Sequence, residues 1–390
     1  MNLELDEKVE IHGFCDEKFA SVKEAFLENF SKHGEVGASF AATINGKFII
    51  DIWAGYADKA KSKPWEKDSI INVFSTTKVM TIICALMLVD RGQLDLDEPV
   101  AKYWPEFAQN GKENILVRQI FSHTSGLAGW DEKMAMEDLY DWDKAVGLLA
   151  AQKPWWEPGS SNGYHATTHG YLLGELVRRI SGKSLGTFFR EEVSGPLNAD
   201  FHIGFGKEHD NRVAELIPWE MPQKGEPGYM EMDPNSFFSR VFTNPIIDIE
   251  KIKTREWRSA EIPAAGGHGN ARSVARIASA IACGGEVDNV RLMNMGTIKK
   301  AKEEQSYTTD LVLMLPIRFG LGFGLPSKEL PLPSPNANAV WWGGAGGSLV
   351  IMDLDNKVSL SYVMNQMSMM IVGDPRAMGL MKAFYENLSK

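Results

Sequence analysis

A serine and a lysine three residues apart are the side chains whose types and spacing best fit chemistry. Ser75 and Lys78 lie in the motif Phe74-Ser75-Thr76-Thr77-Lys78, at the entrance to a strongly apolar helical run. On a helix the two side chains share one face, and the free N–H groups at a helix start favour a developing anion. A serine becomes a good nucleophile when a neighbour takes its proton. The motif indicates acyl chemistry at Ser75, and an ordinary N-cap serine followed by a solvated lysine is the open alternative.

Further motifs follow Ser75 in a fixed order along the chain. Tyr164 lies in Gly163-Tyr164-His165-Ala166, and a glycine-rich stretch, 341–348, lies near the C-terminus. The stretches Leu94-Asp95-Leu96-Asp97 and Ser122-His123-Thr124-Ser125-Gly126-Leu127 stand between Ser75 and Tyr164. Over nearly the whole chain, this ordered set resembles the class C β-lactamase and penicillin-binding-protein superfamily of serine hydrolases. The resemblance is strongest to its esterase branch, the family VIII carboxylesterases.

The resemblance implies a role for each matched residue. Ser75 would attack the acyl carbon, and Lys78 would either keep Tyr164 partly ionised or itself accept the serine proton. Tyr164 would relay the proton to the leaving alcohol and later activate water, which requires help because an unperturbed tyrosine has a pKa of about 10. The backbone N–H groups of Ser75 and Ala345 would form the oxyanion hole.

Two departures from the lactamase pattern bear on the substrate. Trp342-Gly343-Gly344 stands where β-lactamases have Lys-Thr-Gly, so a cation that helps to hold a carboxylate is missing. Tyr164-His165-Ala166 stands where they have Tyr-x-Asn, so a substrate-binding amide is missing. Both losses favour neutral esters over anionic lactams. We therefore predict a serine carboxylesterase for small, short-chain acyl esters, and weak β-lactam hydrolysis stays open.

Other functions compete with this prediction. A β-lactamase, a D-amino-acid peptidase or an amidase would share the machinery but not the substrate, and acyl transfer to an alcohol is not distinguished from hydrolysis. A non-catalytic binding protein on the same fold is the alternative from another class. The intact set of Ser75, Lys78 and Tyr164 argues against it.

Several other residues invite a functional interpretation. The residues expected to line the substrate pocket are Trp342, Gly343, Gly344, His165, Trp155 and Trp156. Ordinary packing is as good an interpretation of Trp155 and Trp156. Ser184 matches a G-x-S-x-G motif, but it lies between two expected helices rather than after a strand, as a nucleophile elbow requires. His165 and His169 are four apart without further metal ligands at suitable spacing. We predict no metal and no organic cofactor.

The amino-acid composition limits the classes of binding partner that we expect. The 390 residues carry 41 basic and 51 acidic side chains, a net charge of −10 that disfavours nucleic acid and anionic membranes. The 3 cysteines match neither a disulfide framework nor a zinc site. The acidic start lacks a secretory signal, and no apolar run approaches the roughly 20 residues of a membrane span. We expect a cytoplasmic protein with a small-molecule ester substrate, and a homodimer is left open.

The two ends of the chain have an α/β pattern, and these elements must position the motifs. Helices are predicted near 16–33 and 375–388, and strands at 37–44, 47–53, 339–352 and 357–364, with Asn45-Gly46 as a hairpin turn. The fold class is α/β, a mainly antiparallel sheet flanked by helices as in β-lactamases, with an inserted, mostly helical domain. We assign 1–74 and 265–390 to the α/β domain and 75–264 to the helical domain, with a long irregular segment at about 206–264.

Overall fold

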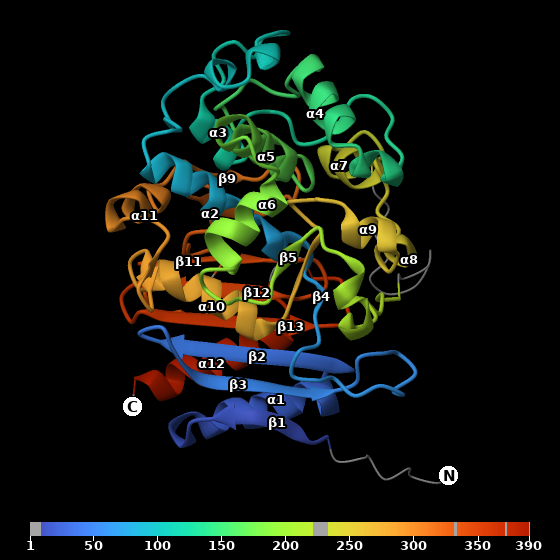
Figure 1. The fold of residues 1–390 in the computed structure, drawn as a ribbon, viewed down its shortest axis with the longest axis vertical. Helices are drawn as coiled ribbons and strands as arrows, with labels where there is room; N and C mark the ends of the chain where they lie inside the picture. The colour runs from blue at the N-terminus through green and yellow to red at the C-terminus, as the bar shows by residue number, and fades with distance from the viewer. Residues whose placement is uncertain (1–8, 221–232, 331–333, 371–372, 390) are drawn as a thin grey trace.

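A six-stranded antiparallel sheet combines strands from both ends of the chain (Figure 1). The structure, a computed structural model, describes residues 9–220, 233–330, 334–370 and 373–389. The strand order is β1-β3-β2-β13-β12-β11. The strands are β1 (Ile11–Cys15), β2 (Gly37–Ile44), β3 (Lys47–Gly55), β11 (Ala339–Gly343), β12 (Leu349–Asp353) and β13 (Val358–Met364).

Two contacts fix the centre of this sheet. The predicted hairpin turn joins β2 to β3, and both turn residues have positive φ, 51° at Asn45 and 77° at Gly46, as a type I′ turn requires. β13 pairs with β2 from Val358 opposite Ile44 to Met364 opposite Ala38. The C-terminal strands therefore continue the sheet that the N-terminal hairpin begins.

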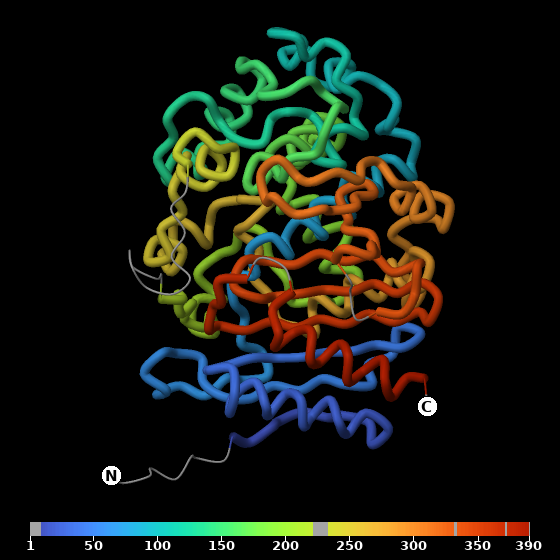
Figure 2. The backbone as a smooth tube through the Cα atoms, turned by 180° about the vertical axis from the view of Figure 1, so that it is seen from behind, coloured from blue at the N-terminus to red at the C-terminus, as the bar shows by residue number. Residues whose placement is uncertain are grey.

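Helices cover both faces of the sheet. α10 (Ala271–Ala282) lies against β2, β12 and β13. On the opposite face α1 (Ala20–Lys32) packs beside α12 (Pro375–Leu388), as Figure 2 shows from behind. The rings of Phe19 and Phe384 stack there, with centroids 4.8 Å apart. The predicted helices at the two ends of the chain thus form one layer.

A mostly helical region lies above the sheet in Figure 1. Its central helix, α2, is buried on all sides because 12 of its 14 side chains are enclosed, and it packs against α5 and α6. A small three-stranded sheet, ordered β4-β6-β5, lies beside the start of α2. The elements are β4 (Ile71–Asn72), α2 (Thr77–Asp90), α3 (Val117–Phe121), α4 (Trp142–Ala151), α5 (Thr168–Ser181), α6 (Leu185–Phe189), β5 (His202–Ile203) and β6 (Gly267–Gly269).

Two sequence predictions need correction. The strand predicted over 339–352 is interrupted between β11 and β12, because Gly346 and Gly347 adopt φ of 91° and 123° and the Gly344 N–H bonds to the Ser348 carbonyl. The segment predicted to be irregular, part of which (221–232) lies outside the described residues, contains three short helices. α7 (Phe237–Thr243) and α8 (Ile249–Ile252) begin at side-chain caps, Ser236 and Asp248, and α9 (Arg255–Ser259) follows without one.

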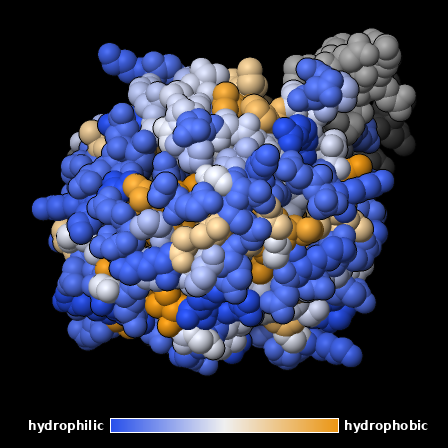
Figure 3. All heavy atoms as spheres, turned by 90° about the horizontal axis from the view of Figure 1, so that it is seen from above, coloured by the Kyte–Doolittle hydropathy of each residue, from blue (hydrophilic) through white to orange (hydrophobic). Residues whose placement is uncertain are grey.

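The remaining elements lie between α10 and β11 along the chain. They are β7 (Glu286–Val287), β8 (Val290–Arg291), α11 (Met295–Ala301), β9 (Ser306–Thr309) and β10 (Pro316–Phe319). β7 contacts α10, and α11 contacts α2. The face in Figure 3 is mostly hydrophilic, with small separate hydrophobic patches. Within the described ranges, no helix is both long and apolar enough to cross a membrane. The division into domains at 74/75 and 264/265 stays a prediction.

Candidate active site

Ser75 lies at a sharp bend between β4 and α2. The bend is a short 3₁₀ helix, Phe74–Thr76, and Phe74 has a φ of 44°, which is uncommon for an aromatic residue. The Val73 N–H donates to the Gly267 carbonyl of β6, so the approach to the bend is fixed by the small sheet. Ser75 is partly exposed although its neighbours are buried. The bend therefore presents the hydroxyl at an accessible position.

The structure brings Lys78 and Tyr164 to the Ser75 hydroxyl. The Tyr164 hydroxyl donates to Ser75 Oγ at 2.6 Å, and Lys78 Nζ lies 3.0 Å from the same oxygen. Lys78 Nζ also donates to the carbonyls of Ala166, at 2.6 Å, and Ala264, at 3.1 Å. Ser75 lies in the 3₁₀ bend and Lys78 in the first turn of α2, and the segment before α5 adds Tyr164 to this cluster.

Burial sets the charge of the two partners. Both side chains are enclosed. Enclosure lowers the pKa of Lys78 well below its usual range, and it raises the pKa of Tyr164, against the lowering effect of the hydrogen bond with Ser75. Burial therefore favours the uncharged form of both the amine and the phenol. With two N–H groups bound to carbonyls, a neutral Lys78 can direct its lone pair to the Ser75 hydroxyl.

A buried carboxylate that sequence reasoning missed holds Tyr164 in place. Asp310 Oδ1 accepts the Tyr164 N–H at 3.0 Å and the N–H groups of Val312 and Leu313, each at 2.9 Å. Its Oδ2 accepts from the Asn162 side-chain amide at 2.8 Å. The one signal in the sequence is a lone acid in the apolar stretch 310–315.

Three buried histidines pack behind Tyr164. The His123 ring lies 5.2 Å from the Tyr164 ring and 4.3 Å from that of His169, and its Nδ1 accepts the His165 N–H at 3.2 Å. His165 Nε2 lies 2.8 Å from Ser125 Oγ. Burial lowers the pKa of His165 to about 3, so this ring is neutral at physiological pH. Because His165 is fully enclosed, a direct contact with substrate stays a prediction.

The glycine-rich loop after β11 lies directly against the serine bend. A Cβ at Gly344 would be 2.1 Å from the Val73 carbonyl oxygen and 3.2 Å from Ser75 N. Ser348 Oγ donates to the same carbonyl at 3.1 Å and lies 2.9 Å from Thr76 Oγ1. Within the described part of the chain, the N–H groups of Ser75 and Ala345 donate no hydrogen bond. Both residues, like Gly343, are partly exposed. Their place in an oxyanion hole stays a prediction.

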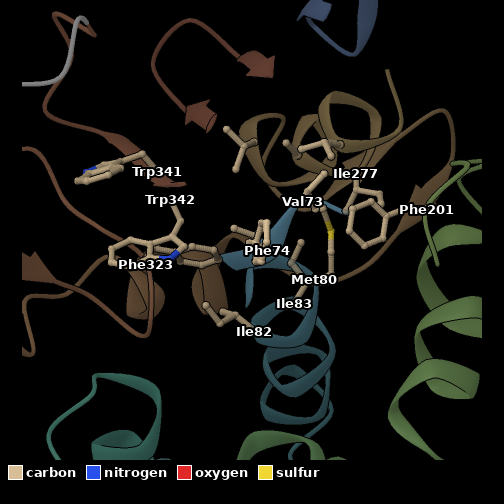
Figure 4. Close-up of a cluster of buried hydrophobic side chains, with 14 of the residues drawn as sticks. Val73, Phe74, Met80, Ile82, Ile83, Phe201, Ile277, Phe323, Trp341 and Trp342 are labelled. Atoms are coloured by element: carbon tan, nitrogen blue, oxygen red, sulfur yellow. The ribbon is translucent and has the colours of Figure 1, made fainter. Parts of the chain in front are cut away.

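Trp342 is the tryptophan that faces Tyr164. Its ring centroid lies 5.4 Å from that of Tyr164 and 5.3 Å from that of Phe319. In Figure 4 Trp342 points toward Phe323 and Phe74, whereas Trp341 points away. The Trp342 indole N–H is buried and has no hydrogen-bond partner among the described residues. An aromatic wall thus occupies the position next to the proposed site.

Trp155 and Trp156 lie outside this cluster. Both rings pack against Phe237 of α7, at 5.8 and 5.4 Å, and the Arg240 guanidinium covers Trp155 at 3.7 Å. The Trp156 ring also meets the His165 ring edge-on, with centroids 6.1 Å apart, but among the described residues no ring contact or hydrogen bond joins either tryptophan to Ser75, Lys78 or Tyr164. Their place in a substrate pocket therefore stays a prediction.

Two other candidates from the sequence have structural partners. Ser184 caps α6 through the Thr187 N–H, and its hydroxyl donates to Glu261 Oε1 at 2.6 Å. The described residues contain no group of three or more His, Cys, Asp or Glu side chains that could hold a metal ion. Neither feature adds a second reactive centre.

The site is a partly exposed serine with a buried lysine and a buried tyrosine at its oxygen. The fold is an antiparallel sheet with a helical region beside it. Together they define a serine hydrolase of the β-lactamase-like fold. The beta-lactamase family model matches residues 22–379. This chain belongs to the beta-lactamase family. The predicted fold class is thereby confirmed.

Several known proteins are similar over most of the chain. A solved family VIII carboxylesterase shares 39% identity at a TM-score of 0.90, covering 97% of this chain and 100% of its own. A penicillin-binding-protein homologue from Caulobacter crescentus shares 38% at a TM-score of 0.89, over 97% and 100%. The curated esterase/beta-lactamase LipL of Mycobacterium tuberculosis is 34% identical over 92% of this chain and 83% of its own.

Proposed function

We propose that this protein is a serine carboxylesterase that hydrolyses small neutral esters through an acyl-enzyme on Ser75. The observation that carries the proposal is the Ser75 hydroxyl between Lys78 Nζ and the Tyr164 hydroxyl. The relatives named as carboxylesterase and esterase/beta-lactamase support the same reaction class. We also propose that the reaction needs no cofactor.

Acylation begins when Ser75 Oγ attacks the ester carbonyl carbon. A neutral Lys78 accepts the serine proton, because its lowered pKa makes the free amine available. The negative charge that develops on the carbonyl oxygen is met by the N–H groups of Ser75 and Ala345, and loss of one such donor costs about 2.7–4 kcal/mol in comparable enzymes. Tyr164, whose phenol stays protonated, delivers a proton to the leaving alcohol. Lys78 then returns the proton to Tyr164.

Deacylation reverses these proton transfers. Water takes the place of the alcohol beside Tyr164, and the Lys78–Tyr164 pair removes its proton as it attacks the acyl carbon. Ser75 Oγ then leaves with a proton, which restores the free enzyme. The same two N–H groups stabilise the oxyanion in both halves of the reaction.

The preference for neutral esters rests on the charges around the site. Among the described residues, the contacts of Ser75, Tyr164 and Trp342 include a single basic side chain, Lys78, which is enclosed and whose lowered pKa favours the uncharged amine. A substrate carboxylate would therefore lose water without gaining an opposite charge. Trp342 and the apolar rings beside it favour an uncharged acyl or alcohol group.

β-Lactam hydrolysis is the second candidate, because the beta-lactamase family model covers this chain and LipL is named for both activities. It would use the same serine and the same oxyanion donors. The missing cation at position 342 predicts that it is the weaker activity. Cytoplasmic location and dimer formation stay predictions from the sequence.

Hydrolysis of p-nitrophenyl acetate, butyrate and octanoate, measured beside nitrocefin, tests the proposal. For the wild-type protein we expect fast ester cleavage and little nitrocefin turnover. In Ser75→Ala we expect both activities and the fluorophosphonate labelling to be lost. Ser184→Ala is the matched control, and it should keep full labelling. Labelling that persists in Ser75→Ala would refute the role of Ser75, and nitrocefin turnover faster than ester turnover would refute the substrate class.

A further inference from the structure

A buried arginine on α12 contacts the loop that carries Ala345. Arg376 is 2% exposed, and its Nη2 donates to the Gly346 carbonyl at 2.8 Å. Its Nη1 donates to the Gln366 carbonyl at 2.7 Å. Two carboxylates hold the guanidinium, with Asp374 Oδ2 at 2.8 Å from Nη2 and Glu35 Oε2 at 3.3 Å from Nη1. The arginine thus joins α12, the segment after β13 and the glycine-rich loop.

The loop backbone lies directly on this ion pair. A Cβ at Gly347 would be 2.4 Å from Asp374 Oδ2 and 2.9 Å from Arg376 Nη2. The Ser368 N–H donates to the same Gly346 carbonyl at 3.0 Å, and the Ser368 hydroxyl donates to Asp374 Oδ2 at 2.6 Å. A β-turn of glycines has many accessible conformations, so these contacts select one of them.

A guanidinium is costly to bury unless its charge and its donors are matched. Here the matching groups include the Gly346 carbonyl, one residue after Ala345. Ser348 fixes the same loop through its bond to the Val73 carbonyl, and the Gly344 N–H donates to the Ser348 carbonyl at 2.8 Å. The loop is therefore held at Gly344, Gly346 and Ser348, and the Ala345 N–H lies between the first two of these positions.

We infer that Arg376 is a positioning residue for the oxyanion hole, which holds the Ala345 N–H at the substrate carbonyl oxygen by fixing the Gly346 carbonyl. This inference rests on the proposed function. A positioning role can be distinguished from an ordinary role in the core, because an oxyanion donor acts on the transition state more than on the bound substrate. A misplaced Ala345 N–H should lower kcat and leave ground-state binding nearly unchanged.

The test compares Arg376→Lys with the wild-type protein and with Arg272→Lys. The lysine keeps the positive charge but cannot serve the Gly346 and Gln366 carbonyls and both carboxylates together. Arg272, in the first turn of α10, makes a similar, partly enclosed ion pair with Asp51 of β3, at 2.5 Å. Measured are kcat and KM for p-nitrophenyl butyrate, and the affinity for phenylboronic acid, whose adduct with a serine oxygen is tetrahedral and anionic.

We expect kcat of Arg376→Lys to fall about 10- to 100-fold, and boronate affinity to fall in parallel. The decrease should be smaller than the roughly 10²- to 10³-fold decrease in kcat caused by losing a whole donor. Arg272→Lys should change stability alone. A folded Arg376→Lys with wild-type kcat and boronate affinity would overturn the inference. If Arg376→Lys does not fold, Ser368→Ala takes its place under the same criteria, because it loosens Asp374 without burying a charge. Ester turnover that is absent, or independent of Ser75, in the wild-type protein would refute the proposed function instead.

Discussion

The reactive cluster contains two side chains whose burial favours their uncharged forms. Lys78 is enclosed beside Tyr164 and three buried histidines, and its amine donates to two carbonyls. The motif alone leaves the division of labour between the two residues open. In the mechanism that we propose, the lysine accepts the serine proton and the tyrosine delivers a proton to the leaving group.

The pH dependence of turnover should report the lowered pKa of Lys78. The active form is the free amine, so kcat/KM should rise with pH through that pKa and level off at a pH well below the ordinary range of lysine. Lys78→Arg, which stays charged, should lose about 10²- to 10⁴-fold in kcat. Stopped-flow rates with an ester of a pH-insensitive alcohol would check this. A Lys78→Arg variant within tenfold of wild type would contradict it.

Tyr164→Phe should separate proton transfer from packing. The phenyl ring keeps the contacts with His123 and Trp342, so the thermal unfolding temperature should stay within a few degrees of wild type. Without the hydroxyl, kcat should fall about 10²- to 10⁴-fold. Tyr140→Phe, which removes a hydroxyl from a partly exposed tyrosine, is the control. Unchanged kcat in Tyr164→Phe would remove this residue from the mechanism.

Asp310→Asn should weaken both the site and the fold. An amide has one acceptor oxygen where the carboxylate serves Tyr164 N–H, two further backbone N–H groups and Asn162. We expect a loss of about 1–3 kcal/mol in unfolding free energy, and a tenfold or greater loss in kcat. Asp353→Asn, at a buried turn after β12 with similar backbone bonds, should lose stability alone. Equal kcat losses in the two variants would show that Asp310 has no specific role.

Residue types and spacing located Ser75, Lys78 and Tyr164, because each belongs to a short motif. Asp310 could not be found this way. Its bonds to the segment of Tyr164 join residues far apart in sequence, and its own neighbours carry no motif. Sequence analysis did not identify Arg376 for the same reason, since its partners come from three separate segments.

At the scale of elements, the close approach of β11 to the serine bend is the decisive contact. Gly344→Ala should separate them, because the new Cβ would meet the Val73 carbonyl at 2.1 Å and Ser348 Oγ at 2.5 Å. A displaced loop removes one oxyanion donor, so kcat should fall by at least about 10²-fold. Gly379→Ala is the matched control, since it meets no atom within 4 Å in α12, and a helix gains about 0.5–1 kcal/mol from this change. Equal kinetics of both variants would contradict the contact.

At the two ends of the chain the sequence predicted α1, α12 and every strand of the large sheet except β1, and it missed the break between β11 and β12. Strand-like runs identified 37–44, 47–53 and 357–364, and helical spacing identified α1. The run 339–352 is apolar on both sides of its glycines, so hydrophobic pattern alone continues the strand. The break depends on the φ angles of Gly346 and Gly347 and on the contact with Arg376, which no local pattern contains.

At the scale of the molecule, one buried guanidinium faces two carboxylates. The pKa of Asp374 is lowered by its bonds to Arg376 despite burial, whereas burial raises the pKa of Glu35 to about 7. Glu35 also accepts the Tyr362 hydroxyl. With one cation for two acids, the second carboxylate holds a proton that the unfolded chain would release.

The unfolding free energy should therefore fall as pH rises from about 4.5 to 7, because the folded state binds more protons there. Glu35→Gln should flatten this dependence by on the order of 1–3 kcal/mol. Urea denaturation at pH 5, 6, 7 and 8 measures it, with Glu24→Gln on the exposed face of α1 as the control. Parallel curves for wild type and Glu35→Gln would contradict the assignment.

The pattern of the two chain ends predicted one antiparallel sheet, but it did not predict which strands would be neighbours. Any strand with suitable faces could have paired with β2, since hydrophobic alternation specifies a face rather than a partner. The observed neighbour is β13, and this choice depends on packing against α10 and on the layer of α1 and α12.

The pairing of β2 with β13 has a consequence for synthesis. A ribosome releases β2, Ser75 and Tyr164 long before β13 and the loop with Ala345, and domains fold as units while the chain emerges. Until the last strands leave the exit tunnel, β2 has an open edge and the serine has one oxyanion donor. The nascent chain therefore lacks the second oxyanion donor, and during that interval the open edge of β2 exposes N–H and C=O groups that can pair with another chain.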